Sequence, residues 1–297
     1  MTQPPSVAVQ SVLYGNLPED ILRAAEALAN SASWARERRA ISAWSYLLGD
    51  SSPERALGAD DVARIDRIIA ASGGSFEYVF FGKNLGHGGG QNRLAERSSS
   101  ELILILNPDG QLGPDAVGVL VDTVGNGVGA ADARQVPFEH PKDYDPITGD
   151  ASWSSGACLM TPREAFDGVG GFDHRTFFMY CDDVDYSWRL RLAGYRTVYA
   201  PSASLFHDKR LSLRGDMQAG EAEVYYSAEA ALMLAYKYSR PDIVKSLVAA
   251  FARGDANAQR AAAEFARRRS DGELPRQLDA DHRVGQFVKG NYAVHRF

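Results

Sequence analysis

The sequence predicts an α/β fold: an open, mostly parallel sheet flanked by helices, followed by a helical C-terminal extension. Short apolar runs alternate with segments whose apolar residues recur at helical spacing, which is the pattern of βαβ units. Residues 102–106 are apolar throughout, as expected of a central strand covered on both faces. From Glu221 to about Arg269 the chain is rich in alanine and charged residues, and this composition favours helices.

The composition is that of a packed globular chain. Of 297 residues, 45% are hydrophobic and 24% charged, which excludes disordered and collagen-like proteins. A net charge of −6 argues against a dedicated nucleic-acid binder, because such proteins normally carry a basic excess. Two cysteines provide no disulfide framework or cysteine zinc cage. The sequence contains no signal pattern and no run near the ~18 apolar residues of a membrane span, so we expect a cytoplasmic protein.

The first predicted elements alternate between strand and helix. Residues 7–13 form a short apolar run rich in β-branched residues, which predicts a strand. A helix follows from Asn16, with an early proline and acidic residues in its first turn. Residues 40–48 predict a second strand, a helix begins at about Asp60, and residues 76–81 predict a third strand.

The later elements are less regular, and the sequence contains no internal repeat. A glycine loop at residues 86–90 precedes the strand at 102–106, and residues 125–151 lack a clear period. Within that stretch we expect a mobile loop at residues 138–149. We then expect a strand, a helix and a strand at residues 155–160, 182–193 and 196–200. The predicted division is a domain of residues 1–215 and an extension of residues 216–297.

Polar side chains stand where the predicted strands end: Asp50, Asn84, Asn107 and Asp109. In open α/β sheets, ligands bind beyond the carboxyl ends of the strands. The carboxylate of Asp109 follows a buried strand and can meet a divalent cation, which in turn can hold a diphosphate. Asn-Pro-Asp-Gly is also a good type I turn, so this segment by itself fits a structural role equally well.

The glycine loop allows the backbone to approach a phosphate or a sugar closely. A competing interpretation is a dinucleotide fingerprint, since Gly86, Gly88 and Gly90 follow a strand and Asp109 lies about 20 residues further on. The spacing of the third glycine and the two preceding strand–helix units argue against that interpretation.

Three carboxylates within four residues, Asp182, Asp183 and Asp185, follow an aromatic run. Such crowding raises the affinity of at least one of them for a proton or a cation. An ionised carboxylate in this position can act as a general base toward a hydroxyl. We assign that role to Asp183, whereas Asp185 fits an i,i+4 ion pair with Arg189.

Two further residues are candidates for ligand contacts. His207 ends a strand, and its neutral imidazole can complete the coordination of a cation, while the following Lys209 and Arg210 can neutralise a phosphate leaving group. A lone histidine is nevertheless more often a surface or core residue. Trp153 is a candidate platform for stacking on a sugar, although tryptophan more commonly belongs to the core.

Taken in order, these segments resemble the family 2 glycosyltransferases, whose nucleotide-sugar-binding fold is called GT-A. The resemblance is strongest to the bacterial rhamnosyltransferase-like and galactofuranosyltransferase-like branches and covers roughly residues 7–215. Its motifs are Gly49-Asp50-Ser51-Ser52, Asn84-x-Gly86-x-x-Gly89-x-x-Asn92, Leu106-Asn107-Pro108-Asp109, Ser155-Gly156-Ala157, Val169-Gly170-Gly171-Phe172-Asp173, Phe178-x-Tyr180-x-Asp182-Asp183-Val184-Asp185 and the later His207.

The resemblance implies a role for each candidate residue. It implies that Asp109 is the metal-binding end of the Asp-x-Asp motif and that His207 is an additional ligand of Mg²⁺ or Mn²⁺. Asp183 resembles the catalytic base, and Asp182 and Trp153 occupy positions implied to contact the acceptor or its sugar. Contacts with the nucleotide-sugar donor are implied for Asp50, Asn84, Gly86, Gly89, Asn92 and Asn107.

The motifs depart from the family pattern at several positions. Position 107 is Asn where many relatives have Asp, which leaves one protein carboxylate for the metal. Position 182 is Asp where the rhamnosyl branch usually has Glu, and in this respect the motif is nearer the galactofuranosyl branch. Gly49 and Ser51 also differ from the usual residues. These departures leave the donor sugar open.

The resulting hypothesis is an inverting, metal-dependent glycosyltransferase of cell-surface polysaccharide or glycoconjugate synthesis. Its donor is a dTDP- or UDP-linked sugar, rhamnose- or galactofuranose-like, and its acceptor is a carbohydrate or lipid-linked glycan. Two alternatives are a nucleotide-dependent oxidoreductase and a non-catalytic nucleotide-sugar-binding protein. The identity of the acceptor glycan, the oligomeric state and contact with the inner face of the cell membrane stay open.

Overall fold

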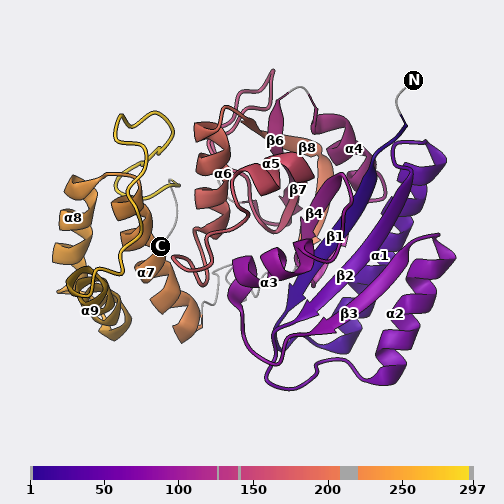
Figure 1. Cartoon of the computed structure of the whole chain (residues 1–297), viewed down its shortest axis with the longest axis horizontal. Coiled ribbons are helices and arrows are strands. Elements are labelled where there is room, and N and C mark those ends of the chain that lie inside the picture. Colours follow the sequence, from indigo (N-terminus) through magenta and orange to yellow (C-terminus); the bar gives the residue numbers. More distant parts are fainter. Residues whose placement is uncertain (1–2, 126, 140–141, 208–219, 294–297) are drawn as a thin grey trace.

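The computed structural model describes residues 3–125, 127–139, 142–207 and 220–293. Its first half alternates strands and helices, as the hydrophobic pattern predicted (Figure 1). The elements are β1 (Ser6–Leu13), α1 (Pro18–Glu37), β2 (Ala43–Asp50), α2 (Ala59–Ala71), β3 (Ser75–Phe80), α3 (Gly86–Ala95) and β4 (Leu102–Leu106).

The next part of the chain completes the sheet and carries two short helices and one longer one. These elements are β5 (Gly110–Leu112), α4 (Ala116–Thr123), β6 (Val128–Val136), β7 (Cys158–Pro162), α5 (Arg163–Gly168), α6 (Asp182–Leu192) and β8 (Arg196–His207). The described strands are ordered β3-β2-β1-β4-β7-β6-β8-β5. Strands β3, β2, β1 and β4 are parallel, β7 is antiparallel to both of its neighbours, and β6 runs parallel to β8.

Strand β4 shows how the sheet is covered on its two faces. Leu102, Leu104 and Leu106 belong to a hydrophobic cluster shared with α1, α2 and α4. Ile103 and Ile105 belong to a second cluster, which contains residues of α5 and α6. Because successive side chains of a strand point to opposite faces, both faces are apolar, and the prediction of a central strand covered on both sides is confirmed.

The C-terminal helices are α7 (Glu221–Lys237), α8 (Pro241–Phe251) and α9 (Ala256–Ser270). They lie on the side of α6 remote from α1 and α2 (Figure 1). Val184 and Trp188 of α6 share a buried cluster with Met233 and Leu234 of α7. The predicted boundary at residues 215 and 216 lies outside the described residues, and the helices beyond it share a hydrophobic core with α6.

The glycine segment at residues 86–90 differs from the prediction because it forms the first part of helix α3 and is not a loop. Gly86 begins the helix with φ +68, a conformation that favours glycine. A Cβ at Gly90 would lie 2.7 Å from both methyl carbons of Val12. The small residues therefore allow α3 to pack directly on β1.

Strand β6 was not predicted, and β8 is longer than expected. Residues 128–136 contain glycine, two adjacent alanines, aspartate and arginine, so they lack the β-branched run that marks a strand. Tertiary pairing with β7 and β8 determines their conformation instead. The two cysteines, Cys158 and Cys181, are both buried.

Candidate active site

Asp109 and His207 come together at the end of β4, as the hypothesis of a cation site requires. Gly110 of β5 pairs antiparallel with His207, the last residue of β8. This pairing places Oδ1 of Asp109 3.6 Å from Nε2 of His207. The side-chain nitrogen of Asn107 lies 3.2 Å from the same imidazole nitrogen.

These side chains form a suitable donor set for Mg²⁺ or Mn²⁺, because carboxylate, carbonyl and imidazole groups are ligands of such cations. In the chain as described, no group of three or more His, Cys, Asp or Glu side chains is placed to hold a metal ion. Asp109 and His207 thus offer one carboxylate and one imidazole, with the amide of Asn107 beside them.

Asp183 stands at the first turn of α6. Its Oδ2 accepts a hydrogen bond of 3.0 Å from the backbone nitrogen of Gly156, and its Oδ1 accepts one of 2.8 Å from that of Val184. Tyr180 and Cys181, just before α6, have φ +67 and +57. These positive φ values are costly for residues other than glycine and cluster at functional sites. They set the direction in which α6 leaves the preceding segment.

Residues 155–157 connect Asp183 to the Asp109 side of the site. Beside Gly156, Ser155 accepts a hydrogen bond of 2.9 Å through its Oγ from Nε2 of Gln135. Oε1 of the same glutamine lies 3.3 Å from Nδ1 of His207. On the other side, the Ala157 carbonyl accepts a hydrogen bond of 2.9 Å from the backbone of Asn107. Three consecutive residues thus join the candidate base to the candidate metal ligands.

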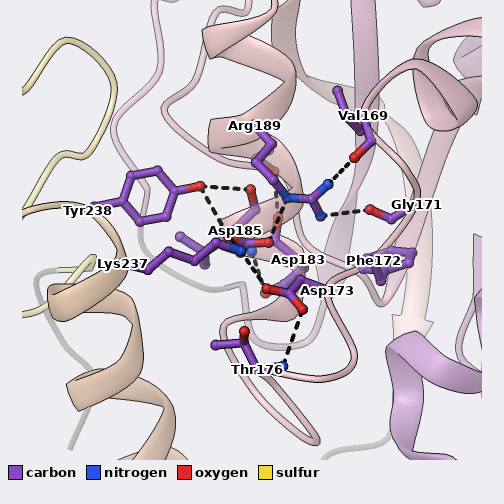
Figure 2. A network of polar contacts seen from close by, with 12 residues as sticks. Val169, Gly171, Phe172, Asp173, Thr176, Asp183, Asp185, Arg189, Lys237 and Tyr238 are labelled. Carbon is purple, nitrogen blue, oxygen red and sulfur yellow. Dashed lines mark hydrogen bonds and ion pairs between the residues drawn. The ribbon is translucent and has the colours of Figure 1, made fainter. Parts of the chain in front are cut away.

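Asp185 has a structural role, as its predicted pairing with Arg189 suggested (Figure 2). It is fully buried and accepts a hydrogen bond of 2.8 Å from Nε of Arg189. Nζ of Lys237 lies 2.6 Å from Asp185 and 2.7 Å from Asp173, and the hydroxyl of Tyr238 donates to Asp185 over 3.1 Å. Lys237 ends α7 and Tyr238 follows it, so this network ties α7 to the helix that carries Asp183.

The same network fixes the loop before α6. Two guanidinium nitrogens of Arg189 donate hydrogen bonds of 2.6 Å to the carbonyls of Val169 and Gly171 (Figure 2). Burial would raise the pKa of Asp173, but the hydrogen bond and the charge of Lys237 hold it below its ordinary value. Asp173 therefore stays ionised at neutral pH and completes the ion pair.

Asp182 is only 4% exposed and has a partner that the sequence analysis did not identify. Its Oδ2 lies 2.6 Å from Nδ1 of His87, on α3. This contact occupies one carboxylate oxygen, and acceptor binding by Asp182 stays a prediction. His87 was missed because it lies within a run of glycines, where only the conformation of the backbone was considered.

Asp50, expected to contact the nucleotide base, is fully buried and organises the turn after β2. Its carboxylate accepts hydrogen bonds of 2.9 and 2.8 Å from the backbone of Ser52 and Ala56 and a further one from the hydroxyl of Tyr78. Asn84 is exposed and accepts a hydrogen bond of 3.0 Å from Gly86. Contacts of Asp50 and Asn84 with a donor stay predictions.

Two of the other donor-loop candidates, Asn92 and Gly86, have packing roles in the structure. Asn92 holds the backbone of Phe172 through two hydrogen bonds of 2.8 Å, one donated and one accepted. A Cβ at Gly86 would lie 2.4 Å from the Phe178 carbonyl oxygen, whereas one at Gly89 would meet nothing closer than 3.4 Å. Their contacts with a donor also stay predictions.

Trp153 is buried, with 2% of its surface exposed. Nζ of Lys142 lies 4.6 Å from the centre of its ring, and Tyr292 packs edge-on against it at 5.3 Å. These neighbours cover the indole, so it offers no open surface for stacking on a sugar. Lys142 forms a buried ion pair with Asp132, which anchors a loop expected to be mobile.

Lys209 and Arg210 lie outside the described residues.

Solved structures share this fold. A mannosyltransferase from Pyrobaculum calidifontis, solved with GDP-Man and Mn²⁺, aligns with a TM-score of 0.56 at 17% identity, over 90% of this chain and 81% of that one. GalNAc-T7, solved with UDP, GalNAc and Mn²⁺, aligns with a TM-score of 0.61 at 11% identity, over 93% of this chain and 56% of that one. The fold is therefore that of the GT-A glycosyltransferases.

The sequence comparisons identify the family of the central segment. Residues 59–187 match the model of glycosyl transferase family 2, so the chain carries a domain of that family. It is 31% identical to an N-acetylglucosaminyl-diphospho-decaprenol L-rhamnosyltransferase of Mycobacterium tuberculosis, over 46% of this chain and 59% of that protein. The rhamnosyltransferase WbbL of Escherichia coli is 40% identical over 18% of this chain and 20% of its own. The chain thus spans about three fifths of the mycobacterial relative.

No helix in the described ranges combines the length and the apolar character needed to cross a membrane.

Proposed function

We propose that this protein is an inverting, metal-dependent glycosyltransferase that moves a sugar from a nucleoside diphosphate to an acceptor hydroxyl. The observation that carries the proposal is the segment of residues 155–157. Its backbone holds Asp183 and Asn107, and its Ser155 contacts the glutamine beside His207. A proton acceptor and a cation site therefore share one framework.

Asp183 is the best candidate for the base among the three acids of α6. Asp182 and Asp185 are buried at 4% and 0% exposure, whereas Asp183 is partly exposed. In the proposed reaction its carboxylate takes the proton of the acceptor hydroxyl while that oxygen attacks the anomeric carbon. The bond from this carbon to the diphosphate oxygen breaks, and the nucleoside diphosphate leaves with the bonding electron pair. A single displacement of this kind inverts the anomeric configuration.

Asp109 and His207 would hold Mg²⁺ or Mn²⁺, with Asn107 beside them. A bound cation supplies positive charge that offsets the negative charge growing on a departing diphosphate. The presence of Mn²⁺ in two structures of the same fold supports a divalent cation as cofactor.

The names of the relatives support a rhamnosyl donor over a galactofuranosyl one. A dTDP-linked sugar is then the first donor to test, with a UDP-linked one next. The mycobacterial relative's name includes an N-acetylglucosaminyl-diphospho-decaprenol, which supports a lipid-linked glycan as acceptor and a place in cell-surface polysaccharide synthesis.

The test is a screen of dTDP-rhamnose and UDP-galactofuranose with the purified protein, measuring release of nucleoside diphosphate with Mn²⁺, with Mg²⁺ and with EDTA. We expect release from one donor, abolished by EDTA. Release unaffected by EDTA would contradict the metal site. Donor binding without release or transfer would instead support the non-catalytic alternative.

The same preparation separates the transferase from the oxidoreductase alternative. We expect a nucleoside diphosphate with Mn²⁺ to raise the melting temperature, because a ligand that binds only the folded state stabilises it. Stabilisation by NAD(P) and not by the nucleoside diphosphate would favour the oxidoreductase.

A further inference from the structure

A histidine that the sequence analysis left unassigned lies against the acids of α6. Nδ1 of His87 lies 2.6 Å from Oδ2 of Asp182, and the imidazole packs edge-on against Phe172 with 5.5 Å between ring centres. The imidazole Nε2 is buried and has no hydrogen-bond partner. Asp182 is therefore the side chain that fixes the orientation of this ring.

His87 also lies close to Asp183. A Cβ at Gly156 would be 3.1 Å from Cε1 of His87 and 3.4 Å from Cβ of Asp183. The two side chains therefore meet the same glycine, whose backbone nitrogen donates to Asp183. Among the described groups, Asp182 and Asp183 are the charged side chains that act on His87.

The protonation of His87 responds to both acids. Burial disfavours the charged imidazolium, but the charge and hydrogen bond of Asp182, together with the charge of Asp183, raise the pKa of His87 above 6.5. A positive charge at His87 in turn favours the ionised form of each neighbouring carboxylate.

Asp182 and Asp185 of α6 have different partners that compensate their charge. Asp185 has Arg189 and Lys237, and Asp182 has His87. Without His87, a buried anion at Asp182 would stand directly beside Asp183, and adjacent carboxylates disfavour each other's ionisation.

We propose that His87 is a positioning residue of the transferase: by compensating the charge of Asp182, it keeps Asp183 ionised and available as the base. This inference rests on the proposed function. It assigns to His87 a role exerted through the acids and no contact with either substrate.

The test compares the pH dependence of kcat in the wild type, His87→Asn, Asp182→Asn and the double variant. At acidic pH, kcat should fall as the base becomes protonated. In His87→Asn we expect this fall in kcat to occur about one pH unit higher than in the wild type, since a lost neighbouring charge has an effect of that order. In the double variant the fall in kcat should return toward its wild-type pH, because the repelling carboxylate is also gone. His282→Asn, which changes an exposed histidine, is the matched control.

A structural role for His87 would give a different result. If His87→Asn lowers kcat by the same factor at every pH, and Asp182→Asn does not reverse the loss, the proposal is overturned. The proposal is also overturned if His87→Asn shows the wild-type kcat and the wild-type dependence of kcat on acidic pH. Melting temperatures of all four proteins identify a variant that fails through unfolding, in which case the double variant decides.

A second readout separates this proposal from the proposed function. The imidazole of His87 can be titrated by NMR in the wild type and in Asp182→Asn, without any turnover. We expect its pKa to fall when Asp182 loses its charge, and an unchanged value would overturn the pairing. Absence of turnover with every donor, combined with the expected titration, would instead refute the transferase and leave the pairing intact.

Discussion

The backbone nitrogen of Gly156 donates a hydrogen bond of 3.0 Å to the carboxylate of Asp183, and so joins a loop between two strands to the first turn of α6. Backbone donors favour the ionised form of a carboxylate. The contact also fixes where that carboxylate lies relative to the residues on either side of Gly156.

Replacing Asp183 by Asn should lower kcat by about 10²–10⁴-fold, the usual contribution of a general base. Donor binding should be largely retained, since the amide has nearly the same shape. Turnover assays and calorimetry with the nucleotide measure the two effects separately. Asp66→Asn, on the exposed side of α2, is the matched control. Unchanged turnover in Asp183→Asn would remove the base assignment.

Asp109→Ala should weaken nucleotide binding in the presence of Mn²⁺ and have little effect in its absence. The reason is that Asp109 is the protein's carboxylate at the candidate cation site, 3.6 Å from His207. Calorimetric titration of dTDP or UDP with and without Mn²⁺ measures this difference. Asp115→Ala removes an exposed carboxylate nearby in sequence and should behave as the wild type. An equal loss with and without Mn²⁺ would contradict metal binding by Asp109.

Gly156→Ala should reduce turnover by about tenfold, which corresponds to about 1.4 kcal/mol. The new methyl group would lie 3.1 Å from His87 and 3.4 Å from Asp183, so at least one of these side chains must move. Gly168→Ala is the control, because a Cβ at Gly168 would have nothing within 4 Å. Steady-state kinetics and urea unfolding separate lost activity from lost stability. Wild-type turnover in Gly156→Ala would contradict this prediction, because the site would then accommodate the added methyl group without loss of activity.

Lys237→Met should lower the free energy of unfolding by about 3–5 kcal/mol, the usual cost of removing one partner of a buried ion pair. Lys237 is 4% exposed and lies within 2.7 Å of both Asp173 and Asp185. Urea denaturation measures the loss, and Lys245→Met, an exposed substitution on α8, should cost far less. Equal stability of the two variants would mean that the network adds nothing to folding.

The stability contributed by His87 should depend on pH. Its pKa is raised in the folded protein above the ordinary value of 6.5, so the stabilisation is fully present below about 6.5 and is lost as pH rises through the folded pKa. His87→Asn should therefore lose more stability relative to the wild type at pH 6 than at pH 8.5. Urea denaturation at the two values measures the difference, and a larger loss at the higher pH would show the opposite linkage.

Most of the parallel half of the fold could be predicted from sequence, because its strands are short apolar runs and its helices are amphipathic. Strand β6 could not, since Gly129, Ala130 and Ala131 have no strand preference of their own and are held by their neighbours. The sequence predicts a loop at the glycines of α3 because glycine has a low helix propensity. The close packing of these glycines on Val12 depends on the fold and cannot be read from the sequence.

The contacts of the candidate site could likewise be predicted only in part from the sequence. The meeting of Asp109 and His207 was implied by the resemblance and is present, and the pair of Asp185 and Arg189 followed from helical spacing alone. The link from His87 to Asp182 spans 95 positions in the sequence, and no local pattern signals a contact at that separation. The same applies to Gln135, whose two contacts join segments that only the folded sheet brings together.

The shared core of α6 and α7 has a consequence for the evolution of this chain. The last helices cannot be exchanged for an unrelated extension without also replacing Lys237 and Tyr238, whose side chains contact Asp185. Nor can they be deleted without baring Trp188, which is now wholly enclosed. Sequence change in these last helices is thereby constrained by α6, whose first turn also carries Asp183.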